Sequence, residues 1–599
     1  YHYDGFGNRV RIEYFDENDN FISNSDGVAV YIPKYNKWGN VIKEYFLDSN
    51  EQLTMNNFGC AIITVDYDDR GNFTKQRFFG IDGEPCLHRD GNAGWTSEYD
   101  DRGNEVKVSY YGVDGEPCLH KEGSAGWTAD YDDRGNEVKV SYYGVDGEPC
   151  LINDGYSSWT SVYDDRGNEV KRSFFGVDGE PCLHKDGNAA RISDYDDRGN
   201  EVKVSFFGVD GEPCLINDGY SSWTSVYDDR GNEVKRSFFG VDGEPCLHKD
   251  GNAARISDYD DRGNEVKRSF FGVDGEPCLN KEGIAGGTVE YDNHGNEVKV
   301  SYFGVDGEPC LYKDGIAGRT FEYDDRGNKI KELYFDREGN PCYNRNGMAG
   351  VLFTYDAYGN EIERLFLDVD GTLQVIEAGF AGFQIKYDQR GRIVEVTFID
   401  IEKNLIRSSN GYARVRYTYD DRGNTTEESY YGADGNLMLT DLGIAKIKRD
   451  FDSRGRMTKQ SYCGLNGKPK QTAIGNAFTT YQYDVRGNLI RVETLGMNEQ
   501  LITNRYGYAY RTMKYDKRDN EIEKHFFDAA GNPAVDNRVG YSVRLQKYSE
   551  MGKIAEQAFL DIHGRPVNCS DGYARVVYLY EGPFVTGHEV YDENGNRLQ

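Results

Sequence analysis

The sequence predicts an all-β chain of tandem β-hairpins that forms an elongated, superhelical or solenoid-like array. Two observations predict it. A motif of Tyr-Asp followed by Gly-Asn returns every 32 residues through nearly all of the 599-residue chain, and the composition includes 71 Gly, 46 Tyr and 30 Phe. Short strands joined by frequent turns suit such a composition better than long helices. A unit this small cannot bury a core alone, so neighbouring copies must share one.

The marker aromatic residue of the motif sets the register of the copies. One additional residue between 533 and 540 precedes the last two markers, and we expect a loop there because loops tolerate insertions. We expect a continuous array over 1–579, which starts inside a repeat, and a divergent terminal repeat at 580–599 as a candidate cap. The markers are Tyr3, Tyr35, Tyr67, Tyr99, Tyr131, Tyr163, Tyr195, Tyr227, Tyr259, Tyr291, Tyr323, Tyr355, Tyr387, Tyr419, Phe451, Tyr483, Tyr515, Tyr548 and Tyr580.

Two turn signals divide each copy into two strands. Residues 100–104 read Asp-Asp-Arg-Gly-Asn, in which Asp bonds the following amides and Gly accepts a positive φ, as in a short hairpin loop. Residues 114–117 read Asp-Gly-Glu-Pro and predict a second turn, where Pro ends the strand ladder. Strands before the first turn alternate apolar and polar residues, as in 411–419, so one face is buried. The strand after the turn breaks this alternation, which indicates a bulge or burial on both faces.

Two arrangements of these strands remain open. An antiparallel meander that repeats by translation needs an even number of strands, and two per copy satisfy this. The alternative is a parallel β-solenoid with one three-sided coil per copy, and the hairpin chemistry of the first turn favours the meander.

A cysteine ladder distinguishes the two arrangements. A parallel coil would stack its cysteines about 4.8 Å apart, close enough for a disulfide, whereas a meander separates them by about twice that distance. We interpret the position as that of a small, partly buried hydrophobe. Nine of the 12 cysteines recur there, at Cys86, Cys118, Cys150, Cys182, Cys214, Cys246, Cys278, Cys310 and Cys342.

Charge and composition exclude several classes of function. The formal net charge of −32 repels nucleic acid and anionic lipid surfaces. The sequence contains no run of about 20 apolar residues that would span a bilayer. An enzyme would need a unique catalytic constellation, whereas almost every feature here is repeated, so we expect no catalysis.

Residues 416–428 read Arg-Tyr-Thr-Tyr-Asp-Asp-Arg-Gly-Asn-Thr-Thr-Glu-Glu. This segment resembles the YD repeat of the RHS and teneurin-like family of bacterial surface proteins, and the match covers about half of nearly every copy. The resemblance implies hairpins that wind into a spiral sheet on secreted or surface proteins, often as a shell around a toxin. The Tyr-Tyr, Asp-Gly and Gly-Trp elements are also similar to hairpin repeats of choline- and glucan-binding modules.

Repeated acidic residues at the turns are candidate calcium ligands. Asp100, Asp101, Glu105, Asp114 and Glu116 stack on their counterparts in adjacent copies, and calcium would relieve the repulsion between like charges. The competing interpretation, which we favour, is that Asp starts turns and solvates a surface. Beyond calcium the sequence calls for no cofactor.

Aromatic residues form a second candidate site. Trp95, Tyr110 and Tyr111, with their equivalents, are candidates for a glycan-stacking platform, although such ladders more often form the core. Four histidines share one register position, which argues for a solvated connection rather than a catalytic base; they are His88, His120, His184 and His248.

Three functions follow, in order of preference. The first is an extracellular or cell-surface structural array, a spacer, adhesin or fibre that associates end to end or laterally with itself or with other surface proteins. The second is a multivalent cell-wall or polysaccharide binder with one weak site per copy. The third is a YD-repeat shell around a secreted toxin.

Overall fold

The computed structural model describes residues 1–15, 21, 23–24, 26–420, 422–452, 454–516, 518–549, 553–581 and 584–598. These residues form 38 β-strands, joined in one sheet in which every pair is antiparallel. Each copy supplies two consecutive strands, so the meander is confirmed and the parallel-solenoid alternative is wrong. No helix long and apolar enough to cross a membrane occurs in the described ranges.

The strands are β1 (His2–Tyr3), β2 (Arg9–Glu13), β3 (Val30–Tyr35), β4 (Val41–Leu47), β5 (Ile62–Tyr67), β6 (Phe73–Phe79), β7 (Gly94–Tyr99), β8 (Glu105–Tyr111), β9 (Gly126–Tyr131), β10 (Glu137–Tyr143), β11 (Ser158–Tyr163), β12 (Glu169–Phe175), β13 (Ala190–Tyr195), β14 (Glu201–Phe207), β15 (Ser222–Tyr227), β16 (Glu233–Phe239), β17 (Ala254–Tyr259), β18 (Glu265–Phe271), β19 (Gly286–Tyr291), β20 (Glu297–Phe303), β21 (Gly318–Tyr323), β22 (Lys329–Phe335), β23 (Gly350–Tyr355), β24 (Glu361–Leu367), β25 (Gly382–Tyr387), β26 (Ile393–Ile399), β27 (Arg414–Tyr419), β28 (Thr425–Tyr431), β29 (Lys446–Phe451), β30 (Met457–Cys463), β31 (Phe478–Tyr483), β32 (Leu489–Leu495), β33 (Tyr510–Tyr515), β34 (Glu521–Phe527), β35 (Val543–Tyr548), β36 (Ile554–Leu560), β37 (Arg575–Glu581) and β38 (Phe584–Tyr591).

The hairpin turn is held by the aspartate of the Tyr-Asp motif. Asp100 Oδ1 accepts hydrogen bonds from the backbone amides of Arg102 (2.8 Å) and Asn104 (2.9 Å), and its Oδ2 accepts one from Asn104 Nδ2 (2.8 Å). Gly103 takes a φ of +90°, which a side chain rarely tolerates. Asp100, Gly103 and Asn104, three of the turn residues predicted at 100–104, therefore each have a structural role.

The second strand of the hairpin contains the predicted bulge. The pairing register of the two strands shifts between Glu98 and Tyr99 of β7. At this point two residues of β8 lie opposite a single residue of β7. After β8, a single bridge joins Tyr111 to Pro117 and the ladder ends there. The connection beyond Pro117 pairs only briefly, as expected for a proline at a strand end.

Each copy is fixed to the previous one at both ends of its strands. At the hairpin-turn end, the Tyr99 hydroxyl donates to the Phe73 carbonyl of the preceding hairpin (2.9 Å), and the marker tyrosines repeat this bond through most of the described copies. At the other end, the Lys121 amide donates to the Asp90 carbonyl (2.8 Å) in the preceding connection. We call the tyrosine bond the tyrosine clamp.

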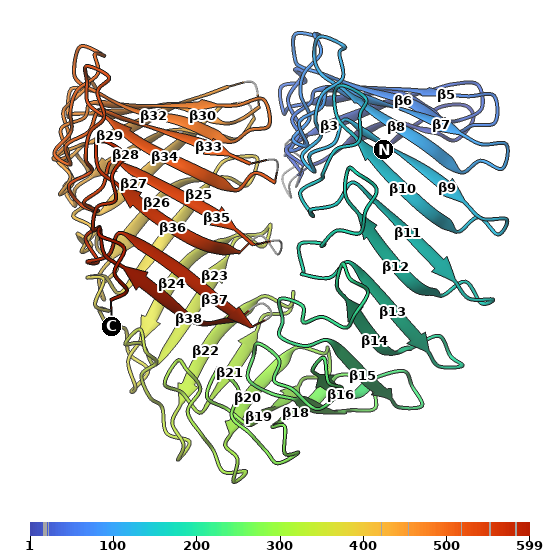
Figure 1. The fold of residues 1–599 in the computed structure, drawn as a ribbon. Coiled ribbons are helices and arrows are strands. Elements are labelled where there is room, and N and C mark those ends of the chain that lie inside the picture. Colours follow the sequence, from blue (N-terminus) through green and yellow to red (C-terminus); the bar gives the residue numbers. More distant parts are fainter. Residues whose placement is uncertain are drawn as a thin grey trace.

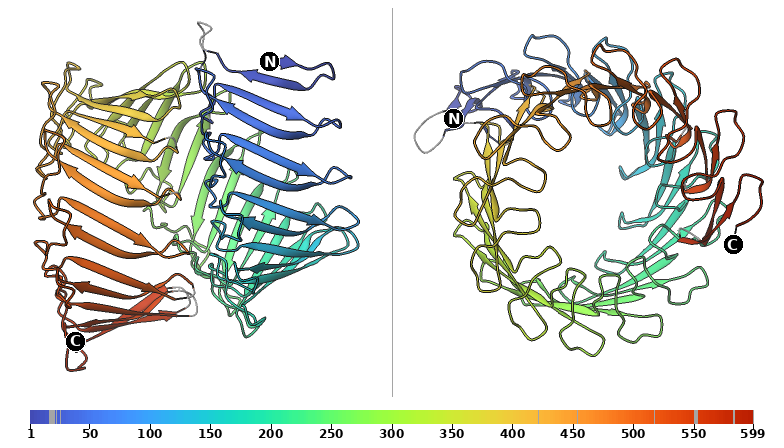
Figure 2. Two further views of the ribbon diagram at one scale, coloured as in Figure 1. Left: turned by 90° about the horizontal axis from the view of Figure 1, so that it is seen from above. Right: turned by 90° about the vertical axis from the view of Figure 1, so that its left-hand side faces the viewer.

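The sheet winds into a spiral around an open centre, as the right-hand view of Figure 2 shows. Arg390 in one hairpin turn forms a hydrogen bond with Thr54, 336 residues earlier, and this separation equals ten and a half 32-residue copies. We call β1–β22 the first turn of the spiral and β23–β38 the second turn. In Figure 1 the first strands of the first turn lie on the right, the sheet crosses at the bottom through β15–β22, and the second turn lies on the left.

The clamp predicts opposite effects for two single-hydroxyl changes. Tyr355→Phe removes the bond to the Lys329 carbonyl (2.9 Å) and should lower the local opening free energy by about 0.5–1.5 kcal/mol. Phe451→Tyr supplies the hydroxyl that is missing from the copy marked by Phe451, and it should raise the local opening free energy there. Hydrogen exchange at the amides of β22–β23 and β28–β29 measures both effects, and unchanged exchange in both variants would contradict the clamp.

Candidate interaction site at the seam between turns

The two turns of the spiral meet along a line that we call the seam. There the connections of the first turn face the hairpin turns of the second. Besides the bond between Arg390 and Thr54, Ser49 Oγ donates to Gln389 Oε1 (3.2 Å). The seam therefore joins the ends of strands, whereas the sheet itself is held by ladders along them.

The cysteine ladder of the first turn lies beside the seam. Burial raises the pKa of Cys118 to about 11, and the nearby charge of Arg454, 336 residues later, opposes that rise. Cys86 and Cys182 have the same relation to arginines in the second turn. A thiol with so high a pKa stays protonated and unreactive at neutral pH. All 12 cysteines are described, and each is a free thiol.

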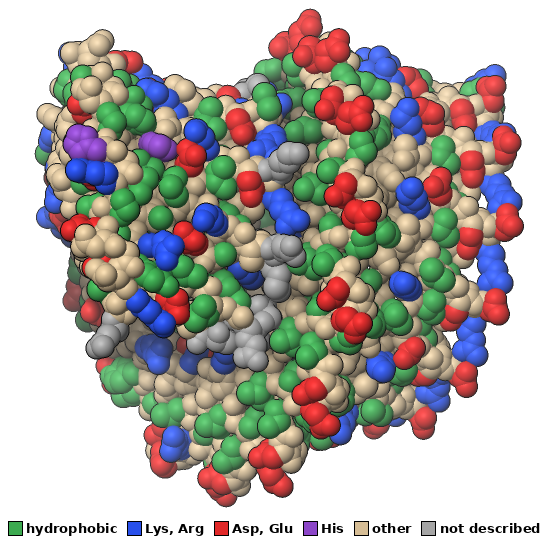
Figure 3. Space-filling view, viewed as in Figure 1, with side chains coloured by type: hydrophobic (Ala, Val, Ile, Leu, Met, Phe, Trp, Pro, Cys, Tyr) green, Lys and Arg blue, Asp and Glu red, His purple; other side chains and the backbone are tan. Residues whose placement is uncertain are grey.

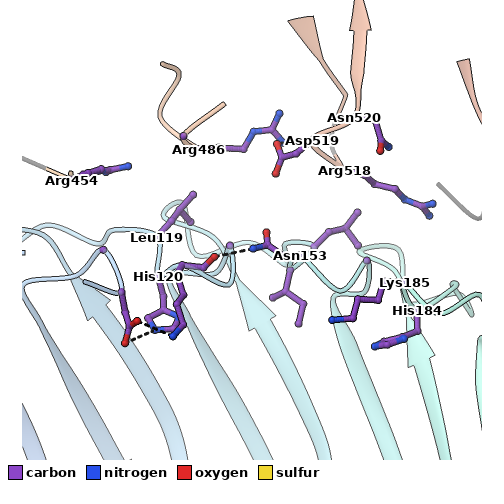
Figure 4. Close-up of a pocket in the computed structure, with 18 of the residues that line it drawn as sticks. Leu119, His120, Asn153, His184, Lys185, Arg454, Arg486, Arg518, Asp519 and Asn520 are labelled. Atoms are coloured by element: carbon purple, nitrogen blue, oxygen red, sulfur yellow. Dashed lines mark hydrogen bonds and ion pairs between the residues drawn. The ribbon is translucent and has the colours of Figure 1, made fainter. Parts of the chain in front are cut away.

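A cavity of about 470 Å³ opens within the seam. Figure 4 shows Arg454, Arg486 and Arg518 of the second turn above Lys185 and the connections of the first turn. Eight cationic side chains line it, namely Arg89, Lys121 and Lys185 from the first turn and Arg454, Arg456, Arg486, Arg518 and Lys553 from the second. In a chain with a net charge of −32, this is a local reversal of charge.

Carboxylates neutralise some of these cations. Arg454, in contrast, donates through Nη1 to the Val485 carbonyl (3.0 Å), a neutral partner. The salt bridges are Lys121 with Asp90 (2.8 Å), Lys185 with Asp154 (2.7 Å), Arg456 with Asp452 (2.7 Å) and Arg486 with Asp519 (3.0 Å). The cavity thus keeps an excess of positive charge.

The opposite edge of the first turn is different. Its hairpin turns carry an alternating row of acidic and basic side chains, visible along the right-hand edge of Figure 3. Arg102 Nη2 lies 2.9 Å from Asp133 Oδ1 of the next copy, and several neighbouring copies repeat the pair. The Asp133 side chain is 99% exposed, so each such pair contributes little to stability.

The structure separates the candidate calcium ligands. Asp100 is occupied by turn hydrogen bonds, while Glu105 accepts a hydrogen bond from the Ser97 hydroxyl. Asp114 and Glu116 lie beyond the far end of β8, where Asp114 Oδ1 accepts the Glu116 amide (3.1 Å). The remaining candidate, Asp101, contacts Arg70. Within the described ranges, no group of three or more His, Cys, Asp or Glu side chains is arranged to hold a metal ion.

The structure also divides the candidate glycan platform. Trp95 and Tyr110 are cross-strand partners on one face, whereas Tyr111 is on the other face, where its hydroxyl lies 3.3 Å from Thr96 Oγ1. The Trp95 ring stacks on Phe73, with 4.9 Å between centroids. The rings of Trp159 and Trp223 are each covered by an arginine side chain instead. Part of the ring surface that a sugar would use is therefore in contact with protein.

The histidine ladder is not a solvated connection, so that interpretation was wrong. The His120 ring stacks on Tyr110 at 4.7 Å, and its side chain is only 13% exposed. His88, His184 and His248 stack on their own hairpins in the same way. The connection folds back over the aromatic face of its hairpin, which explains the burial. Desolvation lowers the pKa of all four histidines.

Sequence reasoning missed the seam, although one signal was present. First-turn hairpin turns mostly read Asp-Asp-Arg-Gly-Asn, whereas the second acidic residue is lost at 388–392, 452–456, 484–488 and 516–520. An additional basic residue also appears at Arg392 and Arg456. The same acidic residue is also absent at 4–8, 36–40, 292–296 and 356–360 and is present at 420–424, so the signal marks only some of the seam-facing turns.

No protein-family model matches the sequence, and no curated protein is significantly similar to it. Among solved structures, the crystal structure of TcdB2-TccC3-Cdc42 aligns with 95% of this chain at 11% identity and a TM-score of 0.39, and the match covers 30% of that chain. The Photorhabdus luminescens Tc holotoxin pore aligns with 93% at 12% identity and a TM-score of 0.29, and the match covers 31% of that chain. This chain spans less than a third of their length, and values so low establish neither its fold nor its function.

The buried histidines predict a pH dependence. Their folded pKa values lie below 6.5, so the stability that the neutral rings contribute is complete above pH 6.5 and decreases as the pH falls below it. Replacing all four with tyrosine should abolish this part of the pH dependence. Tyr312 shows that the replacement fits, because it stacks on Tyr302 at 4.8 Å in the same place. Thermal midpoints of both proteins above and below pH 6.5 test this, and parallel pH profiles would refute it.

Proposed function

We propose that the chain is a structural wall, a coiled β-repeat segment that surrounds a partner polypeptide. The return of the sheet onto itself after 336 residues carries this proposal, because a spacer or fibre has no use for such a return. The tandem hairpin repeat itself is shown, with two strands in each copy. This ranks the shell above the straight array that the sequence favoured.

Two further features support the wall. Large side chains such as Trp95 and Tyr110 are only partly buried on a single-layered sheet, which leaves an aromatic face for a second layer or a partner. The Tyr-Asp motif resembles the YD repeat, whose hairpins form spiral shells in the RHS family. Both the clamp and the turn bonds explain why that motif is repeated.

The wall is proposed to be non-catalytic and extracellular. The same side chains recur from copy to copy, and side chains repeated in this way suit an extended binding surface better than a single catalytic site. Its partners would be proteins, either the enclosed polypeptide or neighbouring walls that meet the strand edges at β1 and β38.

Electron microscopy of the purified chain tests the proposal. We expect short coiled particles that show a ring with a stained centre when viewed along the axis, with or without calcium. Straight or filamentous particles would contradict the wall and restore the spacer. A change of shape on adding calcium would support the acidic turns as calcium sites, and saturable retention on polysaccharide would favour the multivalent binder.

A further inference from the structure

The seam cavity has the size and shape of a small-ligand site. Its volume of about 470 Å³ falls in the range of about 300–1,000 Å³ that is usual for such sites. Both turns line it, so a ligand there would touch residues more than 300 positions apart in sequence. It is therefore a different surface from the face of the sheet that a partner polypeptide would meet.

The charges in the cavity specify the class of ligand. Arg454 and Lys553 extend from the second turn and Arg89 from the first, and no salt bridge is found for these three among the described residues. The Arg89 guanidinium lies 4.6 Å above the Phe58 ring, and Arg454 binds a carbonyl. Like charges on opposite walls repel, so the seam gains stability from an anion placed between them.

Guanidinium groups favour phosphate among small anions. Each presents several N–H donors in a planar fork that matches phosphate oxygens, and lysine adds a point charge. Several cations on two opposing walls suit an anion with several phosphate groups better than a single phosphate. Leu119, Leu151 and Leu183 also line the cavity.

We propose that a small multivalent phosphate binds in the seam cavity and holds the two turns of the spiral together. Binding requires the coiled state, so the ligand stabilises that state relative to an opened one. The bound anion would add to the direct contacts across the seam and shift the equilibrium further toward the closed spiral. This inference depends on the seam and not on the enclosed partner.

Calorimetric titration of the full chain with inorganic tripolyphosphate tests the site. We expect saturable binding of one anion that weakens as sodium chloride is added. Arg454→Ala should weaken binding by about tenfold, since one charged hydrogen bond is lost. Arg198→Ala is the matched control: Arg198 occupies the same turn position in the first turn and contacts Asp229 of the next hairpin, away from the cavity, so binding should be unchanged.

Further variants keep the test decisive. Lys553→Ala should weaken binding while keeping the backbone bonds by which Lys553 closes its hairpin turn with Ser549. Arg454→Lys should retain part of the affinity because it retains the charge. Absence of binding to the wild-type chain, or an equal loss in Arg198→Ala, would overturn the inference. Equal affinity for citrate would overturn the assignment to phosphate. A chain that forms rings but does not bind tripolyphosphate refutes this inference alone and leaves the proposed wall intact.

Discussion

The tyrosine hydroxyl at the end of one hairpin strand donates to a carbonyl of the preceding hairpin, and the architecture depends on this junction. The sheet has one layer, so no second sheet fixes the angle between consecutive hairpins. That angle is set by the strand ladder, by the clamp at the turn end, such as Tyr99 with Phe73, and by the backbone bond between connections, such as Lys121 with Asp90. Because each copy repeats the same junction, small rotations add up to a coil.

The coil creates a contact that no pair of neighbouring copies contains. Ten and a half copies bring the hairpin turn at Arg390 against the connection at Thr54. First-turn connections and second-turn hairpin turns must therefore fit each other, and several of these hairpin turns carry a neutral or basic residue in place of the second aspartate. Arg198 and Arg454 illustrate the change: both donate to the equivalent carbonyl of the next hairpin, but Arg198 also reaches the Asp229 carboxylate on an open edge, whereas Arg454 has Val485 there and lies beside the cavity.

Local features of the fold were predictable from sequence because their causes are local. The turn at 100–104, the bulge beside Tyr99 and the short bridge at Pro117 all follow from residues within one copy. The burial of His120 was not predictable, because it depends on a connection that folds back over its own hairpin. The seam was not predictable either, since its position depends on a rotation per copy that no residue type encodes.

Crosslinking at low protein concentration tests the central claim, the return of the sheet onto itself, most directly. Lys553 and Lys185 line one cavity although 368 residues separate them, so an amine-reactive crosslinker should join them within one chain. Lys185 and Lys249 lie in duplicated segments, and a link from Lys553 to either connects the two turns. If Lys553 links only to lysines of neighbouring copies, the array is open in solution and the spiral account is wrong.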